Sequence, residues 1–308
     1  MQPYSVCCIG LGAMGWGIAK NLALRQSSEI NIASVGVWNR TPCVAQEHAK
    51  AFGTRYVDTL TEAAAADVIV TCLPTSLEVA DIASTMRPHL RTGSLWIDCT
   101  SGEPEMTGQI SKLLSEAGVD MVDSPVSGGP EGSLAGNLTA MVGGASFARA
   151  QPFISMFANR KIVHCGGIGS GNAVKAANNC LNAAHLVLAG EALLALAKFG
   201  VQPEVALEAI NTSSGRSLQT EVRIPTEVLS RRFDYGFKIE LMLKDVNTAV
   251  RSLKMQDDRD SLIHAMRRVL EASTEEQGLG ADYTCVVKTL ENRAGVELHP
   301  GVAPAFQA

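Results

Sequence analysis

A glycine-rich turn near the start of the chain constrains its fold more than any other feature. The segment Gly10-Leu11-Gly12-Ala13-Met14-Gly15 matches G-x-G-x-x-G, with an apolar run at Tyr4–Ile9 before it and a helical pattern at 13–25 after it. In that context one glycine permits the tight turn, one lets backbone approach a pyrophosphate, and one lets helix and strand pack closely. The helix N-terminus adds N–H donors and partial positive charge. The turn therefore predicts a dinucleotide site.

The residues that follow alternate short β-branched runs with helical runs, which is the pattern of a parallel sheet covered on both faces. We expect further strands at Ile32–Trp38, 68–73, 94–99 and 119–123, and helices at 44–51, 77–86 and 105–117. This pattern predicts a Rossmann-type, doubly wound α/β domain over residues 1–167.

The pattern changes near four glycines at 166–171, after which apolar residues recur at helical spacing as far as Gly200. A long helix of roughly 29 residues is expected there, and 239–255 also keeps a helical period. Because 308 residues exceed one ordinary core of about 100 to 150, we expect a second, all-α domain over 168–308. It would carry substrate-binding and oligomerisation surfaces, joined to the first domain by the long helix.

The end of the second predicted strand reads Asn39-Arg40-Thr41, where an NAD site usually carries an acid for the ribose 2′-hydroxyl. A neutral amide, a guanidinium and a hydroxyl can instead bind a 2′-phosphate, and Arg suits that dianion through paired donors. The sequence therefore favours NADP over NAD.

Composition excludes several other classes of protein. A formal charge of −5 gives no electrostatic support for binding nucleic acid or an anionic membrane. The eight cysteines contain no C-x-x-C pair, so we expect buried free thiols and no metal site. The start lacks a basic, apolar leader and the end lacks a peroxisomal or prenylation signal, which favours a cytoplasmic protein. Polar residues interrupt the apolar run 181–199, so we expect a buried helix, covered by self-association into a homodimer or homotetramer.

Three segments place small or polar residues after predicted strands, where open α/β sheets bind ligands. They are Leu73-Pro74, Asp98-Cys99-Thr100-Ser101-Gly102, and Asp123-Ser124-Pro125-Val126-Ser127-Gly128-Gly129-Pro130. On the long helix, Lys175 and Asn179 are four residues apart and so share one face. A lysine there is usually a solvated charge, but its place beside a glycine-rich hinge makes it a catalytic candidate.

Taken in order, five segments resemble the β-hydroxyacid dehydrogenase family, which includes 3-hydroxyisobutyrate, tartronate semialdehyde, L-threonate and glyoxylate or succinic semialdehyde enzymes. They are GLGAMGWGIAKNL, DCTSGEP, DSPVSGGPEGSLAGNLTAMVGG, GSGNAVKAANN and GFKIELMLKDVNTA, which together span most of the chain.

The resemblance implies a role for each matching residue. It implies that the 10–15 turn, the 39–41 segment, Leu73, Pro74, Ser101 and Lys244 hold the cofactor. Ser127, Gly128 and Gly129 match the site for the substrate carboxylate, and Asp245 is expected to join them in binding substrate. Lys175 matches the catalytic lysine and Asn179 the substrate-orienting asparagine, both in contact with substrate. Where the family commonly has Asp-x-Ser-Thr, this chain has Asp98-Cys99-Thr100-Ser101, which keeps a hydroxyl.

The implied reaction is hydride transfer between NADP(H) and a short, 3-hydroxyisobutyrate-like β-hydroxy acid or its semialdehyde. The alkoxide that forms during reduction needs a proton, which Lys175 can supply. Three alternatives stay open: an imine reductase, which usually lacks this lysine; a 6-phosphogluconate-type enzyme, which needs a larger helical domain; and a non-catalytic NADP-binding module. Specificity is expected to depend on 211–216 and 237–244, which do not rank the acids.

Overall fold

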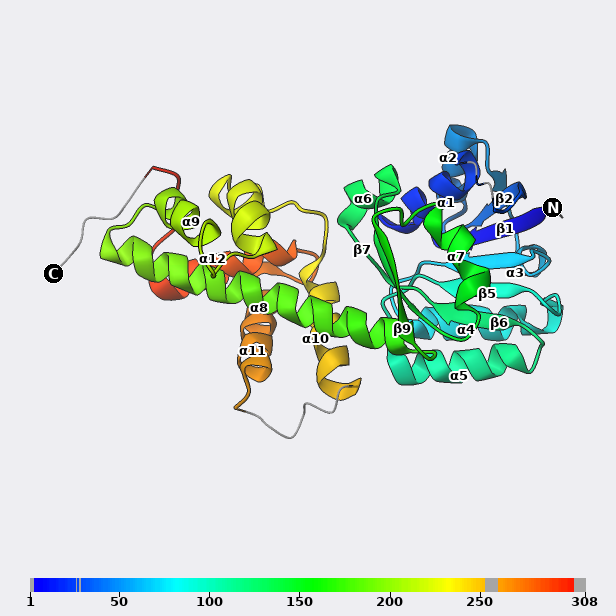
Figure 1. Ribbon diagram of the computed structural model, residues 1–308. Helices are drawn as coiled ribbons and strands as arrows, with labels where there is room; N and C mark the ends of the chain where they lie inside the picture. The colour runs from blue at the N-terminus through cyan, green and yellow to red at the C-terminus, as the bar shows by residue number, and fades with distance from the viewer. Residues whose placement is uncertain (1–2, 26, 28, 253–259, 302–308) are drawn as a thin grey trace. The chain divides into compact units, whose positions relative to one another are not determined.

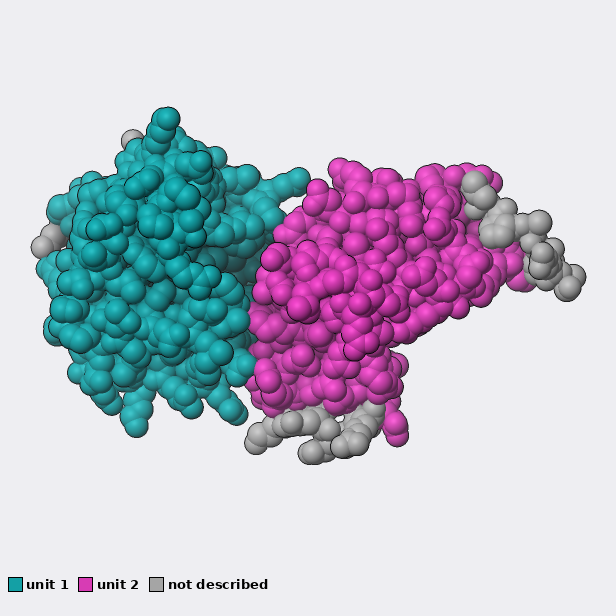
Figure 2. All heavy atoms as spheres, turned by 180° about the vertical axis from the view of Figure 1, so that it is seen from behind, with its two compact units in different colours: residues 1–176 teal, residues 177–308 magenta. Residues whose placement is uncertain are grey.

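The computed structural model describes residues 3–25, 27, 29–252 and 260–301. The chain divides into two compact units, residues 1–176 and 177–308 (Figures 1 and 2). Helix α8, Ser170–Phe199, contributes its first turns to the first unit and the rest to the second. The predicted architecture, a Rossmann-type unit followed by a helical unit along one long helix, is confirmed.

The first unit is built on a sheet whose first six strands are all parallel, in the order β3-β2-β1-β4-β5-β6. Their bounds are β1 Tyr4–Ile9, β2 Ile32–Trp38, β3 Arg55–Tyr56, β4 Val68–Thr71, β5 Leu95–Asp98 and β6 Asp120–Asp123. Three further strands, β7 Val126–Ser127, β8 Thr139–Gly143 and β9 Lys161–Gly166, extend the sheet beyond β6. Strand β8 runs antiparallel to β6 and β7 and parallel to β9. The sequence pattern did not predict β3, β7, β8 or β9.

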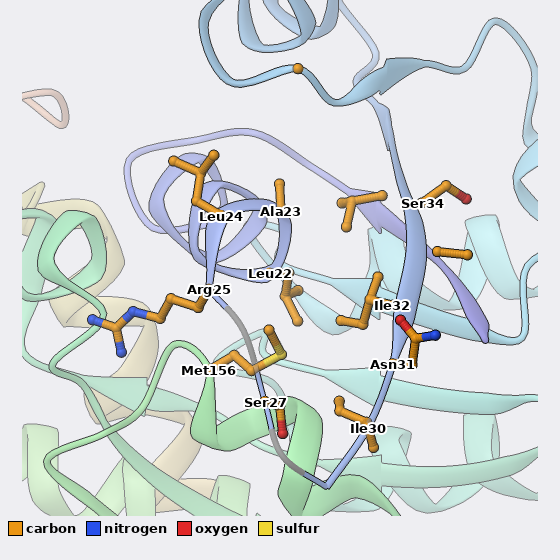
Figure 3. A pocket seen from close by; sticks show the side chains of 13 residues that line it. Leu22, Ala23, Leu24, Arg25, Ser27, Ile30, Asn31, Ile32, Ser34 and Met156 are labelled. Carbon is orange, nitrogen blue, oxygen red and sulfur yellow. The ribbon is translucent and has the colours of Figure 1, made fainter. Parts of the chain in front are cut away.

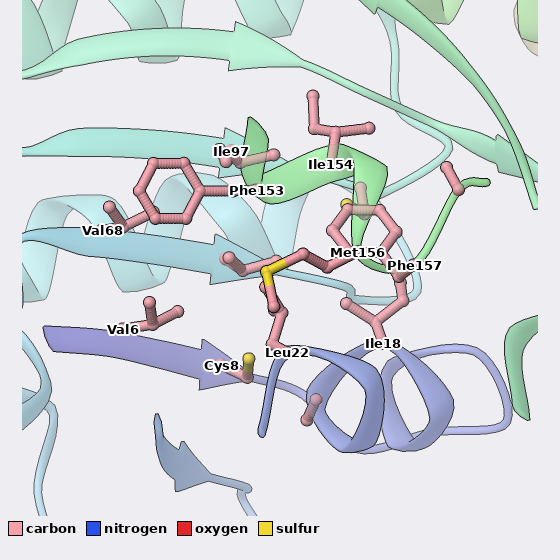
Figure 4. Packing of buried hydrophobic residues seen from close by; sticks show 14 of the residues in the cluster. Val6, Cys8, Ile18, Leu22, Val68, Ile97, Phe153, Ile154, Met156 and Phe157 are labelled. Carbon is pink, nitrogen blue, oxygen red and sulfur yellow. The ribbon is translucent and has the colours of Figure 1, made fainter. Parts of the chain in front are cut away.

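Helices cover both faces of this sheet. They are α1 Gly15–Leu24, α2 Pro42–Phe52, α3 Leu60–Ala63, α4 Ser76–Met86, α5 Pro104–Ser115, α6 Gly129–Ala135 and α7 Phe147–Ser155, with a short 3-10 turn at Arg87–His89. Alternate residues of β1 enter two separate cores: Val6 and Cys8 pack with α1 and α7 (Figure 4), whereas Ile9 packs on the face that holds Met86. Apolar residues at successive positions of the central strands are therefore buried on both sides, as parallel sheets require.

The second unit is helical in the part of the chain that the structure describes, apart from an isolated bridge between Lys238 and Asp282. Its elements after α8 are α9 Pro203–Asn211, the π-helix η2 Gln219–Leu229, α10 Ile239–Ser252, α11 Leu262–Gln277, the 3-10 turn η3 Tyr283–Cys285 and α12 Val286–Ala294. The helix expected over 239–255 corresponds to α10, and its last three residues lie outside the described ones.

Helix α8 has two apolar faces. Its length and the mean hydropathy of 1.6 in an 18-residue window would alone suit a membrane span, and 44% of that window is buried. One face packs inward through Leu186, Leu193 and Leu194. The opposite face is exposed at positions spaced alternately four and three apart: Leu181, His185, Leu188, Ala192, Ala195 and Phe199. Within a single chain, the expected burial of this helix holds for one face, and the other face is the one that self-association was expected to cover.

All eight cysteines are free, as expected, but not all are buried. Cys43 is exposed on α2, and Cys72 and Cys165 are half-buried. Cys43 follows Pro42 on the outward face of the first turn of α2, which the apolar pattern around it did not reveal.

Candidate active site

Strand register brings the predicted site segments to one edge of the sheet. Ile9 pairs with Trp38 on one side and with Thr71 on the other, and Asp98 pairs with Thr71 and Asp123. The segments after β1, β2, β4, β5 and β6 therefore leave the sheet side by side. The strand order reverses between β1 and β4, which is where open α/β sheets bind nucleotides.

The glycine turn fits the close approach of a pyrophosphate. Gly10 has a φ of +92°, and a Cβ there would collide with the carbonyl oxygen of Cys72. A Cβ on Gly15 would likewise collide with the carbonyl oxygen of Gly10. A Cβ on Gly12 would meet no atom within 4 Å, so this glycine borders open space. Two glycines are thus required by the fold itself, and the third leaves room for a ligand.

In the segment after β2, one residue is hydrogen-bonded within the fold and the next two are exposed. Asn39 Oδ1 accepts a hydrogen bond from the Leu11 N–H at 3.0 Å, and its Nδ2 donates to the Thr41 carbonyl at 3.1 Å. Asn39 therefore braces the glycine turn. Arg40 and Thr41 are exposed at the N-terminus of α2, and the Thr41 side chain makes no capping bond to that helix. Both remain available to an anion.

Asp98 holds the segments after β4 and β5 together. Its Oδ1 accepts hydrogen bonds from Thr71 Oγ1 at 2.8 Å and from the Thr100 N–H at 3.0 Å. Thr100 Oγ1 in turn accepts from the Leu73 N–H at 3.1 Å. Burial raises the pKa of Asp98 to about 6, against the opposing effect of the Thr100 and Thr71 bonds. The network fixes the backbone on either side of Leu73 and just before Ser101.

Asp123 caps the start of α8. Its carboxylate accepts hydrogen bonds from the Gly169 N–H at 2.7 Å and the Asn172 N–H at 2.8 Å, beside the positive end of the helix. Burial raises the pKa of Asp123, although these backbone bonds act in the opposite direction. The end of β6 is thereby tied to the helix that carries Lys175.

The segment Ser127-Gly128-Gly129 leads into α6, which is anchored on α1. Ser133 Oγ donates to the Met14 carbonyl at 2.6 Å, and Asn21 Nδ2 donates to the Ser133 carbonyl at 2.8 Å. Gly128 has a φ of +140°, and a Cβ there would lie 2.9 Å from Leu138 Cδ2. The positive φ of Gly128, an exposed residue, is one that other residues rarely adopt, so a side chain is disfavoured at this point.

Lys175 and Asn179 lie one turn apart on α8, with 9% and 4% of their surfaces exposed. Asn179 Nδ2 donates a hydrogen bond to Asp245 Oδ2, and Lys244 Nζ pairs with Asp245 Oδ1 at 3.1 Å. Both oxygens of the Asp245 carboxylate are thus engaged by neighbouring side chains. Asp245, itself 4% exposed, is placed to orient Asn179 and Lys244.

The predicted residues form two groups, one in each unit. The first unit holds the 10–15 turn, the 39–41 segment, Leu73, Pro74, Ser101, the 127–129 segment and Lys175. The second unit holds Asn179, Lys244 and Asp245, and α8 carries Lys175 into line with Asn179. Sequence reasoning gave no role to Asp123 or Asn172, because their partners lie on other elements.

A cavity of about 660 Å³ lies at the other edge of the sheet, between the end of α1 and the start of β2 (Figure 3). Leu22, Arg25, Ile32 and Met156 are among its lining residues, and no predicted site residue borders it. In the part of the chain that the structure describes, no cluster of three or more His, Cys, Asp or Glu side chains is placed to bind a metal ion. The cavity therefore stands apart from the carboxyl-edge site.

The sheet order, the glycine turn and the buried lysine together define a dinucleotide-binding oxidoreductase. Residues 5–167 match the family model described as the NAD binding domain of 6-phosphogluconate dehydrogenase. Residues 169–290 match the model described as NAD-binding of NADP-dependent 3-hydroxyisobutyrate dehydrogenase.

Three known proteins are similar to this chain in sequence or in structure. It is 34% identical to 2-(hydroxymethyl)glutarate dehydrogenase of Eubacterium barkeri, over 95% of this chain and 97% of that one. The structure of Mycobacterium tuberculosis 3-hydroxyisobutyrate dehydrogenase with L-serine matches with a TM-score of 0.83 and 26% identity, covering 94% and 99% of the two chains. A Pseudomonas imine reductase matches at 0.56 and 20% identity, covering 94% and 100%, and shares the fold alone. The chain belongs to the β-hydroxyacid dehydrogenase family and is an NAD(P)-dependent oxidoreductase.

Proposed function

We propose that the protein transfers hydride between NADP(H) and a short β-hydroxy acid or its semialdehyde, with Lys175 moving the proton. The observation that carries this proposal is the buried Lys175 one helical turn from Asn179, whose amide Asp245 holds in place. When bound, the nicotinamide supplies or accepts the hydride. The Lys175 ammonium gives a proton to the developing alkoxide during reduction, and its neutral amine takes the hydroxyl proton during oxidation.

The remaining site residues orient the substrate. Asn179 carries no titratable proton, so its amide positions the reacting oxygen without competing with Lys175. The Ser127 hydroxyl and the backbone N–H groups of Gly128 and Gly129 receive the substrate carboxylate. Because both oxygens of Asp245 are engaged by Asn179 and Lys244, Asp245 acts on substrate through these two side chains.

The cofactor is NADP rather than NAD. No acid stands at the end of β2, and the exposed Arg40 and Thr41 lie at the N-terminus of an 11-residue helix, which favours a 2′-phosphate. Leu73, Pro74, Ser101 and Lys244 are the further residues that would hold the cofactor.

We place the protein in the cytoplasm as a homodimer or homotetramer, without nucleic-acid or membrane partners. The exposed stripe on α8, from Leu181 to Phe199, supports self-association. Its alternating four- and three-residue spacing is the one that lets a second helix interdigitate.

Steady-state oxidation of a panel of acids tests the proposed function, with NADP and NAD compared side by side. The panel holds 3-hydroxyisobutyrate, 2-(hydroxymethyl)glutarate, L-threonate, glycerate and 4-hydroxybutyrate. We expect turnover of at least one acid, with a higher kcat/KM for NADP than for NAD. Silence on all five acids with cofactor bound, or turnover of cyclic imines instead, would contradict the proposal.

A further inference from the structure

The side chain of Asn172 joins three segments of the candidate site. It is 1% exposed in the first turn of α8. Its Oδ1 accepts a hydrogen bond from the Gly102 N–H at 2.9 Å, and its Nδ2 donates to Thr107 Oγ1 at 3.0 Å. Its backbone N–H donates to Asp123 at 2.8 Å. One residue thus links α8 to the loop after Ser101, to α5 and to the end of β6.

The surroundings of these bonds leave little room for adjustment. A Cβ on Gly102 would collide with Ser76 Oγ and lie 3.3 Å from Asn172 Nδ2. The next amide, Glu103 N–H, donates to Ser76 Oγ at 2.8 Å, so the loop is held at two consecutive residues. A Cβ on Gly171 would collide with the Met141 carbonyl oxygen. Close packing therefore fixes both ends of the Asn172–Gly102 bond.

We propose that Asn172 is a positioning residue that fixes the Ser101 loop and the first turn of α8, and hence Lys175, relative to one another. Lys175 follows Asn172 by three residues, so a shift of the first turn is passed along the rigid helix. The Asn172 amide offers an acceptor to Gly102 and a donor to Thr107 at the same time, at every pH at which the protein is folded. The consequence for the rate rests on the proposed function, whereas the placement itself does not.

The central variant is Asn172→Ala. A misplacement of roughly 1 Å can cost about 10² in rate, so we expect kcat to fall about 10- to 100-fold. The dissociation constant for NADP should change less than about threefold, because the glycine turn keeps its own contacts. The backbone amide of Gly102 should exchange its hydrogen faster, as measured by hydrogen-exchange mass spectrometry on the protein without cofactor.

Two further variants separate positioning from general destabilisation. Ser5→Ala removes the hydrogen bond that Ser5 Oγ donates to Asp67 Oδ2 and the one that it accepts from the Asp67 N–H. Ser5 lies near the amino end of β1, away from the candidate site, so this variant should leave kcat and Gly102 exchange unchanged. Asn172→Asp keeps the shape and the acceptor but regains the donor only when protonated. Burial beside the Asp123 carboxylate raises the pKa of an acid at this position. Its kcat relative to wild type should therefore rise as the pH falls from about 8 to about 6.

The outcomes test separately whether Asn172 fixes the loop and the helix, and whether this placement affects the rate. Unchanged Gly102 exchange in both Asn172 variants overturns the inference, and so does faster exchange with wild-type kcat. An equal fall of kcat in Ser5→Ala also overturns it. If Asn172→Ala does not fold, Asn172→Asp decides by the same two measurements. A wild-type protein silent on the acid panel overturns the proposed function alone, because exchange at Gly102 still decides the placement.

Discussion

At the scale of single residues, Asp98 is a carboxylate in an unusual setting. It is fully buried, its Oδ1 serves Thr71 and Thr100, and its Oδ2 has no hydrogen-bond partner among the described residues. Because burial raises its pKa from 3.8 to about 6, the folded protein binds a proton there more tightly than the unfolded chain does. This contribution to stability is complete below about pH 4 and is lost as the pH rises through 6.

Asp98→Asn should therefore stabilise the protein at neutral and alkaline pH. The amide oxygen keeps the acceptor for Thr71 and Thr100 and removes the buried charge. We expect the free energy of unfolding at pH 8 to rise by about 1 to 3 kcal/mol, with the gain vanishing toward pH 4. Chemical denaturation at several pH values measures it.

Asp67 provides the matched control. Partial burial acts to raise the pKa of Asp67. The Ser5 hydrogen bonds and the Arg91 guanidinium outweigh this effect and hold that pKa below its usual value. Asp67→Asn should then lose stability at pH 8. An equal loss in Asp98→Asn would show that the buried carboxylate is stabilising as an ion.

Residue spacing predicted part of the site, and cross-strand contacts decided the rest. Lys175 and Asn179 are visible as a helical pair in the sequence, and the structure places both on α8. Asn39 is expected to bind a phosphate, and its amide oxygen also accepts a hydrogen bond from the Leu11 N–H, which the sequence did not predict. The roles of Asp98, Asp123 and Asn172 depend on partners between 27 and 70 residues away, which no local pattern encodes.

At the scale of elements, the glycine turn makes a clear prediction because its glycines are packed differently. A Cβ on Gly12 would touch nothing within 4 Å, so Gly12→Ala should fold with an unchanged melting temperature. The added methyl occupies the space where backbone approaches the pyrophosphate. We expect the dissociation constant for NADP, measured by fluorescence titration, to rise about 10- to 100-fold, or about 1.4 to 2.7 kcal/mol.

Gly108→Ala is the control for that variant. Gly108 lies within α5, and a Cβ there also meets nothing within 4 Å. Alanine at this position should raise helix stability by up to about 1 kcal/mol without changing cofactor binding. Wild-type NADP affinity in Gly12→Ala would place the pyrophosphate elsewhere.

The exposed face of α8 makes a second prediction at this scale. Leu188 is 67% exposed at the centre of the stripe, so Leu188→Asp leaves the core of the second unit intact. A carboxylate in an apolar helix contact is strongly unfavourable, and we expect the oligomer to dissociate to monomers. Sedimentation at several concentrations measures this. Leu24→Asp, at a residue 56% exposed on α1, should leave the subunit number unchanged. A monomeric wild type would remove the basis for self-association.

The longer elements were predictable and the shorter ones were not. The apolar runs that became β1 and β2 match their observed bounds, since central strands of a parallel sheet read as largely apolar segments. The two-residue strands β3 and β7 are defined by pairing with β2 and β8, and such short runs carry no period of their own. The π-helix η2 was likewise not predicted from the sequence.

At the scale of the whole molecule, the order of motifs along the chain carried the classification. Each motif alone is compatible with a turn or a solvated helix. Their succession over both units matches the family models at 5–167 and 169–290, which cover the sheet unit and most of the helical one. Substrate identity depends on side chains from several elements at once. The sequence therefore predicted the class of substrate, a short β-hydroxy acid, but not which acid of that class.

The most direct test of the central claim is the single-turnover rate of NADP reduction by the best acid of the panel, in wild type and in Lys175→Ala. The account predicts a rate about 10² to 10⁴ lower in the variant, with the dissociation constant for NADP within about twofold. Lys198→Ala, at the exposed end of the same helix, should match wild type. A Lys175→Ala protein that retains most of the wild-type rate would contradict the claim that Lys175 transfers the proton.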